Sequence, residues 1–301
     1  NNLDLSILTT SSGPSGSSKA RINQKVHDDG ELLDDILLRD AGVKNCIETQ
    51  GKYTIESKIV NVDRAAMARI AGNIASKYGD NGFKGTLTVK LEGAGGQSFG
   101  AFVVGGMDVQ LTGEVNDYVC KSMSGGVVSI KPPPHSGFKA EDATIAGNTC
   151  LYGATGGKVF INGRAGERFA VRNSLGETVV EGCGDHACEY MTGGVVVCLG
   201  RVGRNVGAGM TGGLGYFLDE DNTFESKVNG EIVFMQRICT AAGEKQVKDL
   251  ITEHVERTGS AKGKAVLADW ATKKAQFWQI VPPSEAQTAE VLSAEANVQV
   301  A

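Results

Sequence analysis

The sequence predicts a mainly β protein in which short parallel strands follow one another around a coil, an architecture known as a parallel β-helix or solenoid. A ten-residue segment ending in a glycine pair recurs six times, with Leu175 once in place of the first glycine, and a short apolar run accompanies each recurrence. All but one of the steps between closing glycines are 18 to 20 residues long, a period typical of solenoids. The closing glycines are Gly106, Gly126, Gly157, Gly176, Gly194 and Gly213.

The apolar runs are the predicted strands. They are too short for helices and are rich in the β-branched residues that suit a pleated sheet. They cover residues 87–91, 109–111, 127–130, 159–161, 179–180 and 195–199. Because stacked strands lie about 4.8 Å apart, roughly seven coils would form a rod about 30–35 Å long.

A corner residue opens each ten-residue segment: Gly96, Asn116, Gly147, Gly166, Gly184 and Gly203. Asparagine is the non-glycine residue that best tolerates a left-handed backbone, so we expect glycine at the corners for its backbone angles. Replacing Gly166 or Gly203 with valine is therefore predicted to destabilise the coil strongly. Four positions after the corners stands a column that is small and apolar in five rows of six, as a tight interior requires: Gly100, Cys120, Leu151, Ala170, Cys188 and Gly207.

The segments outside the repeats give the predicted domain organisation. Residues 1–26 are a flexible lead-in, and residues 27–84 contain a short helix (31–39), a strand (53–62) and an amphipathic helix (64–78) with Asp63 as its N-cap, which covers the open end of the coil. The β-helix repeats occupy residues 85–240. C-terminal helices follow over 241–283, at 244–256 and 265–277, and residues 284–301 form a loose tail.

Composition narrows the class of function. A net charge of −5 argues against nucleic acid or an anionic membrane as the main partner. No apolar run is long enough for membrane insertion and no signal peptide is visible, so a soluble protein is expected. The seven cysteines are odd in number and fit no common ligand spacing, which favours free thiols in a reducing compartment.

Two motifs resemble functional sites without the required context. The segment 207–212 matches G-x-G-x-x-G, but residues 214–217 after it do not look helical, whereas a dinucleotide fingerprint must open a helix. Cys183 and Cys188 flank Gly184 and His186 as a metal site would, yet no second cysteine pair follows at zinc spacing. Both cysteines are interpreted as buried small apolar residues, and a Cys–His catalytic pair would lack an orienting third group.

Charged residues give no further site. Arg164, Arg168 and Arg172, with Arg201 and Arg204 two rows on, could form an anion-binding strip, but solvated arginines paired with Glu167, Glu177 or Glu181 are favoured. His27, His135 and His254 look isolated, and Asp219, Glu220 and Asp221 read as a loop. The sequence therefore nominates no catalytic, cofactor-binding or metal-binding residue.

Longer motifs identify a family. Residues 147–157, 162–174, 184–194 and 203–221 closely resemble the C-terminal GXGXG-repeat domain of the glutamate synthase large chain. The resemblance runs from about residue 28 to Pro283, while residues 1–27 match poorly. The ending at 277–285 looks most like the ferredoxin-dependent enzyme of plastids and cyanobacteria.

The resemblance implies a right-handed β-helix that acts as a non-catalytic scaffold. In the family it holds glutaminase and FMN-barrel domains in register, so that ammonia passes between them and glutamate is made from glutamine and 2-oxoglutarate. FMN and a three-iron cluster belong to those other domains, whose catalytic and cofactor residues have no counterpart in this sequence. The implied location is the plastid stroma or the cyanobacterial cytoplasm. Two readings stay open: part of such an oxidoreductase, or a free-standing relative recruited as a structural linker or interaction subunit of a larger assembly.

Overall fold

The computed structural model describes residues 3–9 and 30–292 of the chain. The chain divides into two units, residues 1–30 and 31–301. In the first, the short helix α1 (Ser6–Thr9) follows an extended start, and Leu3, Leu5 and Leu8 are exposed. Most of the predicted lead-in and the end of the predicted tail lie outside the described residues. The rest of the fold concerns the second unit.

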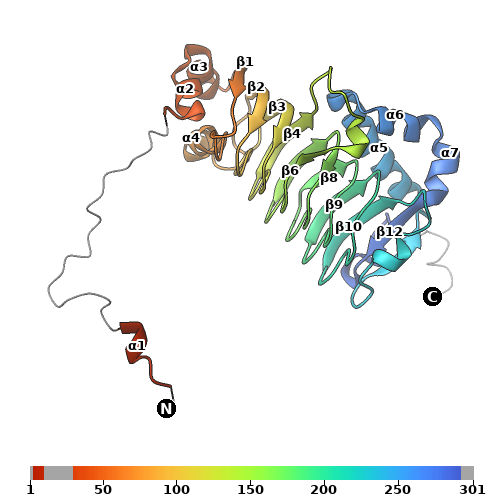
Figure 1. Ribbon diagram of the computed structural model, residues 1–301. Coiled ribbons are helices and arrows are strands. Elements are labelled where there is room, and N and C mark those ends of the chain that lie inside the picture. The colour runs from red at the N-terminus through yellow and green to blue at the C-terminus, as the bar shows by residue number, and fades with distance from the viewer. Residues whose placement is uncertain (1–2, 10–29, 293–301) are drawn as a thin grey trace. The chain divides into compact units, whose positions relative to one another are not determined.

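One sheet of 12 strands dominates the second unit, and Figure 1 shows most of them side by side in chain order. The main order is β1 (Lys52–Ile59), β2 (Thr86–Gly95), β3 (Met107–Val115), β4 (Ser124–Lys131), β6 (Gly156–Ile161), β8 (Glu177–Val180), β9 (Thr192–Cys198), β10 (Gly212–Leu218), β12 (Phe277–Val281) and β11 (Phe234–Arg237). The short strands β5 (Thr144–Ala146) and β7 (Arg164–Ala165) pair beside this path. Pairing is parallel from β1 to β10, and β12 is antiparallel to both β10 and β11.

Strand register places like residues above one another. Val89 is opposite Val109, Val109 opposite Val128, and Val128 opposite Val159, and all four side chains are fully buried. Such columns of β-branched residues pack well on a pleated surface. The predicted strands at 87–91, 109–111, 127–130, 159–161, 179–180 and 195–199 all contribute to this sheet.

The ten-residue segments stack in rows, where a row is the segment from a corner residue to its closing glycine. The residues two, four and six positions after each corner have a left-handed backbone, which costs about 1–2 kcal/mol for a non-glycine residue. Row-to-row hydrogen bonds offset this cost: the N–H groups of Ser98, Tyr118 and Thr149 donate to carbonyl oxygens of the next row at 2.8 Å. The residues at these three positions of the six rows are Ser98, Gly100, Phe102, Tyr118, Cys120, Ser122, Thr149, Leu151, Gly153, Arg168, Ala170, Arg172, His186, Cys188, Tyr190, Asn205, Gly207 and Gly209.

The corner glycines have a different role from the one predicted. Gly166 and Gly203 are not among the left-handed residues. Instead, a Cβ atom at Gly166 would lie 2.2 Å from Oδ1 of Asn148, and one at Gly203 would lie 2.0 Å from Oδ1 of Asp185. These side-chain oxygens accept the N–H groups of Glu167 and Arg204, at 2.8 and 2.9 Å. The corners therefore need glycine because neighbouring rows approach closely.

The predicted fold class, a mainly β right-handed parallel β-helix of about seven coils with capping helices, is wrong. The described residues form one mixed sheet with helices packed against it. Each repeat supplies one main strand to this sheet, whereas most of each ten-residue segment is turn. A glycine period indicates that repeats stack, but it does not say how much of each repeat is strand. It also carries no information about the antiparallel strand β12 or the position of the last helices.

Three helices lie beside β1: α2 (Leu33–Arg39), α3 (Ala41–Thr49) and α4 (Ala68–Tyr78) (Figure 1). The carboxylate of Asp34, on α2, accepts the N–H groups of Met67 at 2.7 Å and Arg69 at 2.8 Å and so caps α4. Burial raises the pKa of Asp34, and these hydrogen bonds act in the opposite direction. The predicted N-cap, Asp63, instead accepts the N–H of Val60 within a turn, and α3 was not predicted.

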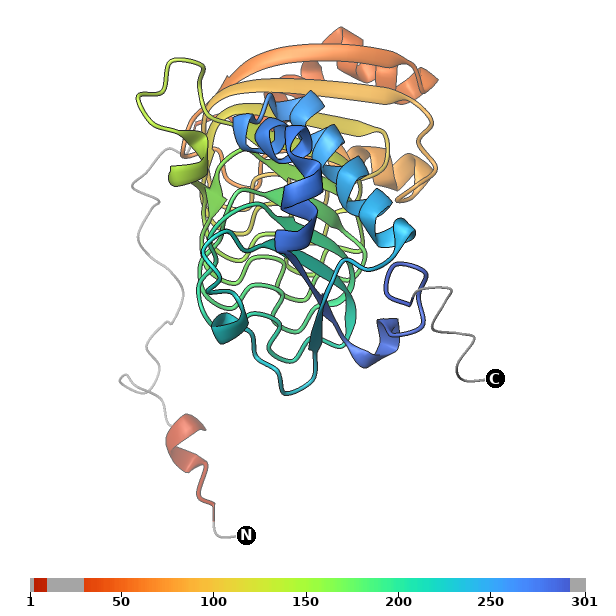
Figure 2. The same ribbon diagram turned by 90° about the vertical axis from the view of Figure 1, so that its right-hand side faces the viewer.

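The C-terminal helices cover a face of the sheet. Helix α5 (Ala241–Thr258) lies against β4, β6, β8 and β9, and α6 (Ala261–Ala268) and α7 (Trp270–Lys273) follow it (Figure 2). Val247, Leu250 and Ile251 of α5 join outward-facing strand residues such as Phe160 and Val197 in a second core. Lys158 on β6 donates to Glu253 at 2.8 Å, and Arg257 donates to Asp108 on β3 at 3.2 Å.

Burial along the strands follows this coverage. β3 alternates between buried and partly exposed residues, because α5 covers little of its outer face. In β10 every residue is buried, because both faces of the strand are covered.

The predicted helix at 244–256 lies within α5. The one predicted at 265–277 breaks into the end of α6, then α7 and the 3-10 turn η3 (Lys274–Gln276), before β12 begins at Phe277. Further 3-10 turns are η1 (Ala140–Asp142), η2 (Glu225–Lys227) and η4 (Pro283–Glu285).

Replacing Gly203 with alanine is expected to lower the free energy of unfolding by about 2–4 kcal/mol. The added Cβ would displace Asp185 and weaken its charged hydrogen bond to the Arg204 N–H. Gly72 on α4 is the matched control, because a Cβ there meets nothing within 4 Å. Gly72→Ala should be neutral or stabilise by up to about 1 kcal/mol. Equal urea midpoints for Gly203→Ala and the unmutated chain would show that the rows tolerate a side chain at this corner.

Candidate functional site

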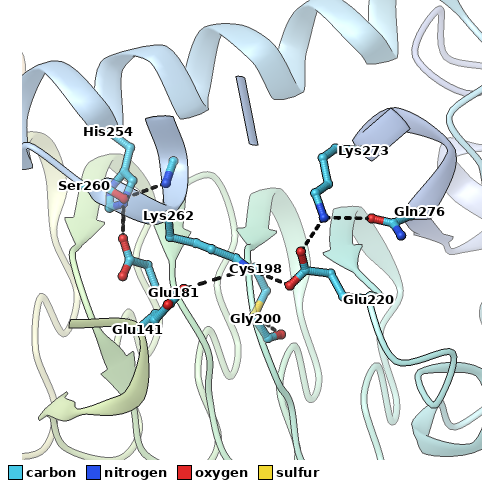
Figure 3. Close-up of polar contacts among 11 residues, drawn as sticks. Glu141, Glu181, Cys198, Gly200, Glu220, His254, Ser260, Lys262, Lys273 and Gln276 are labelled. Atoms are coloured by element: carbon cyan, nitrogen blue, oxygen red, sulfur yellow. Dashed lines mark hydrogen bonds and ion pairs between the residues drawn. The ribbon is translucent and has the colours of Figure 1, made fainter. Parts of the chain in front are cut away.

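A cavity of about 400 Å³ opens where several strands end near α6. Because parallel strands run in the same direction, the residues that follow β8, β9 and β10 meet at one edge of the sheet. Glu181, Arg201 and Asp219 come from these positions. Arg164 on β7 and Lys262 on α6 also line the cavity. Figure 3 shows the polar contacts on the α5 and α6 side of this region.

A buried polar cluster joins the sheet to the helices at this edge. Oε1 of Glu181 lies 3.2 Å from Nε2 of His254 on α5 and also accepts the hydroxyl of Ser260 (Figure 3). Ser260 in turn accepts the Gly263 N–H at 2.8 Å and is the N-cap of α6. Glu181 is 2% exposed, and His254 and Ser260 are fully buried. The cluster therefore fixes the end of α5 and the start of α6 to the residue that follows β8.

The same cluster is poorly arranged for nucleophilic catalysis. In a serine nucleophile the hydroxyl donates to a histidine base, which a carboxylate then orients. Here Ser260 donates to Glu181, and His254 contacts the same carboxylate oxygen. Nδ1 of His254 is buried without a hydrogen-bond partner in the described part of the chain. The arrangement suits anchoring of helices better than proton transfer to a substrate.

A second polar network lies beside the first. Glu220, just after β10, accepts hydrogen bonds from Lys262 on α6 and Lys273 on α7 (Figure 3). Lys262 also lies 3.9 Å from Glu141 of η1, within the long repeat. Partial burial alone would raise the pKa of Glu220, but the two lysine ammonium groups outweigh burial and hold this pKa below its ordinary value. The network therefore ties α6 and α7 to the end of β10.

The predicted carboxylate loop at 219–221 is confirmed as a loop, but its residues are not free. Both oxygens of the buried Asp219 are used: Oδ1 accepts the N–H groups of Thr223 and Phe224, at 2.9 and 3.3 Å, and Oδ2 accepts Nε1 of Trp278 at 3.1 Å. Asp221 accepts the hydroxyl of Thr223 at 2.6 Å. The three carboxylates thus stabilise the local structure.

Cys183 and Cys188 are buried thiols, as interpreted from the sequence, whereas Cys239 is exposed. Cys183, Cys188 and Cys198 are at most 1% exposed, and each is free. Burial raises the pKa of Cys188, and the hydrogen bond that the Cys183 thiol donates to Cys198, together with burial, raises the pKa of Cys183. Nδ1 of His186 lies 2.9 Å from the side-chain nitrogen of Asn205. Within residues 3–9 and 30–292, no three His, Cys, Asp or Glu side chains are grouped so that they could hold a metal ion.

The structure also shows the surroundings of the glycine-rich segment 207–212 and of the arginines. The glycine-rich segment 207–212 leads into β10, so the helix that a dinucleotide fingerprint requires does not follow it. The arginines have partners other than the predicted ones: Arg168 contacts Glu189 at 2.8 Å and Arg204 contacts Asp185 at 3.0 Å. Glu177 pairs with Lys158 at 3.5 Å instead.

His254 was predicted to be isolated, and this is wrong, because Glu181 contacts it. Sequence reasoning also missed Ser260 and Lys262 as members of the site. Ser260 was detectable, since it follows Gly259, the left-handed C-cap of α5, in the N-cap position of a new helix. His135 is exposed, and His27 lies outside the described residues.

The chain is a repeat protein, in which glycine corners stack on one another and each repeat contributes a strand to one sheet. The model of the GXGXG motif family matches residues 34–283, and the chain belongs to that family. The relatives that it resembles are ferredoxin-dependent glutamate synthases. The chloroplastic enzyme of Spinacia oleracea is 57% identical over 96% of this chain, and synthase 2 of Synechocystis sp. is 57% identical over 89%. The resemblance stated from the glycine motifs is thereby confirmed.

The chain spans 18% of the length of the spinach enzyme and 17% of the Synechocystis enzyme. Synthase 1 of Arabidopsis thaliana, described as chloroplastic/mitochondrial, is 57% identical over 97% of this chain. A match that extensive includes most of residues 1–27, and the family model begins at residue 34. The expectation that residues 1–27 match the family poorly stays a prediction. Among the described helices, none has the length and apolar composition needed to cross a membrane.

Replacing Ser260 with alanine is expected to lower the free energy of unfolding by about 2–3 kcal/mol. The change removes the N-cap of α6 and leaves the buried Glu181 with one hydrogen bond fewer. Ser76→Ala is the control, because Ser76 is an exposed residue on α4 that bonds only to its own helix, and it should change stability by less than about 0.5 kcal/mol. In a double-mutant cycle, Ser260→Ala and Glu181→Gln should be strongly non-additive. Additive effects would mean that the two residues act independently.

The lowered pKa of Glu220 gives a pH prediction. Because the folded-state pKa is depressed, the stabilisation is fully present above the ordinary value of 4.5 and is lost as pH falls through the folded-state pKa. Glu220→Gln should therefore lower the melting temperature at pH 7 and flatten its decline between about pH 5 and pH 3. Thermal melts across this range test it. Parallel pH profiles for the two proteins would show that other carboxylates control acid unfolding.

Proposed function

We propose that this chain serves as the non-catalytic structural part of a ferredoxin-dependent glutamate synthase and positions the parts of the enzyme that carry out the chemistry. The observation that carries this proposal is the 57% identity to such enzymes over nearly the whole chain, which corresponds to 18% of their length. The remaining length of such an enzyme belongs to other domains. We assign to them the binding of the substrates glutamine and 2-oxoglutarate, of FMN and of an iron–sulfur cluster.

The way polar residues are used supports a structural role. Glu181, His254 and Ser260 contact one another in a buried cluster that anchors two helices. Glu220 joins Lys262 and Lys273 in the same way. A catalytic acid or base must instead present a group within reach of its substrate. Apart from Nδ1 of His254, these side chains use their hydrogen-bonding groups within the protein, as a rigid support requires.

Rigidity is the property that a positioning part must have. The rows hold one another through backbone hydrogen bonds, and α5 contacts β4, β6, β8 and β9. A small displacement of the reacting groups lowers the rate of an enzyme. A rigid support therefore affects catalysis by keeping the parts that carry those groups at fixed separations. The location proposed for the chain, a plastid or a cyanobacterial cell, follows from the names of its relatives.

The alternative is that the chain is a structural or interaction subunit of another assembly. Both proposals give it a structural role, but in the first it is a segment of a synthase polypeptide and in the second a separate chain. Capture of the protein from its native source with an antibody against this segment, followed by intact-mass analysis, separates the two. A mass near that of a complete synthase supports the proposal. A short free chain that travels with unrelated proteins supports the alternative.

The purified chain is expected to show no flavin absorbance and no hydrolysis of glutamine. A full synthase carrying Gly203→Ala in this segment should retain its flavin but lose glutamate synthesis at a lower temperature than the unmutated enzyme, because the support unfolds first. Gly72→Ala is the control and should leave the inactivation temperature unchanged. A yellow isolated chain, or one with glutaminase activity, would falsify the scaffold assignment.

A further inference from the structure

Cationic side chains on the wall of the cavity have hydrogen-bonding capacity that the protein does not use. Nε of Arg164 is buried and has no partner in the described part of the chain. The arginine runs across Gly182, where a Cβ atom would lie 3.0 Å from its Cγ and 3.1 Å from its Nε. Glycine at this position therefore leaves room for the Arg164 side chain beside the cavity.

Arg201 and Lys227 face the same space. Arg201 approaches Asp221 only at 3.9 Å, beyond hydrogen-bonding distance, and its side chain is 82% exposed. The ammonium group of Lys227 makes no hydrogen bond or ion pair with the described residues. By contrast, Lys262 is engaged by Glu220. Arg164 and Lys227 thus lack a carboxylate partner among the described residues, and Arg201 is only loosely paired with Asp221.

The carboxylates of the wall are mostly occupied. Glu181, Asp219 and Glu220 are held by Ser260, by backbone N–H groups and by lysines, respectively. Asp221 accepts the Thr223 hydroxyl and lies 3.9 Å from Arg201, and Glu141 lies 3.9 Å from Lys262. Asp142 remains unpaired among the described residues. The wall carries six carboxylates and four cations, so its unpaired positive charge, on Arg164 and Lys227, exceeds the unpaired negative charge of Asp142 by only one. This balance favours a mono- or dianion over a polyphosphate.

We propose that this cavity binds a small oxyanion, a molecule with one or two carboxylate or phosphate groups, between the guanidinium groups of Arg164 and Arg201 with Lys227 at the rim. Guanidinium groups suit this role because their planar N–H forks match carboxylate and phosphate geometry. A volume of about 400 Å³ is in the range of small-molecule sites. The proposal does not rest on the scaffold role, since binding is a property of this chain alone.

Isothermal titration of the chain with succinate and, separately, with inorganic phosphate tests the proposal at low ionic strength. Saturable binding of at least one probe is expected, and it should weaken as salt is added. Binding of succinate alone identifies a carboxylate ligand, and binding of phosphate alone identifies a phosphate ligand. If neither probe saturates by about 10 mM, the proposal is wrong.

Arginine variants locate the site. Arg164→Gln and Arg201→Gln should each weaken binding about tenfold or more, whereas Arg172→Gln should leave it unchanged. Arg172 is the control because it is exposed outside the cavity and donates to the hydroxyl of Tyr152 at 3.3 Å. Arg201→Gln keeps the test decisive if Arg164→Gln fails to fold, since the Arg201 side chain is largely in solvent. Equal weakening by all three variants would overturn the proposal in favour of general charge attraction.

Discussion

The close stacking of one row on the next is the constraint on which the rest of the structure depends. The turns bond directly through backbone groups, with N–H donors of one row 2.8 Å from carbonyl oxygens of the next. This spacing leaves no room for a side chain at Gly166 or Gly203. It also sets the register of the parallel strands, and hence which side chains meet in the interior.

Polar residues extend that constraint to the helices. The outer face of β8 and β9 is apolar and is covered by α5, but apolar contact alone does not fix a helix in one position. The buried carboxylate of Glu181 does so, because it must keep both His254 and Ser260 as partners to remain satisfied. Lys262 of α6 lines the cavity, so its position beside Glu220 follows from this anchoring.

Local and repeated features were predictable from the sequence, whereas contacts between distant segments were not. The rows, most strands and the helix at 244–256 follow from glycine spacing and apolar pattern. The residues of the buried polar cluster could not be grouped in this way, since Glu181 and His254 are 73 positions apart and meet only through the packing of α5 on the sheet. One available signal was overlooked: the apolar run at 195–199 is continuous, whereas residues 87–91 alternate, and a continuous run indicates a strand covered on both faces. That contrast would have placed a helix over the later strands.

The position of α5 has a consequence for the order of events during protein synthesis. The ribosome makes β6, β8, β9 and β10 before residues 241–258 exist, so the outward side chains of Phe160, Val179 and Val197 have no cover when their strands first emerge. Such uncovered apolar strands associate readily with other chains. Covering this face must therefore wait until residues 241–258 have emerged, and in that interval the nascent polypeptide exposes an apolar strand surface to other chains.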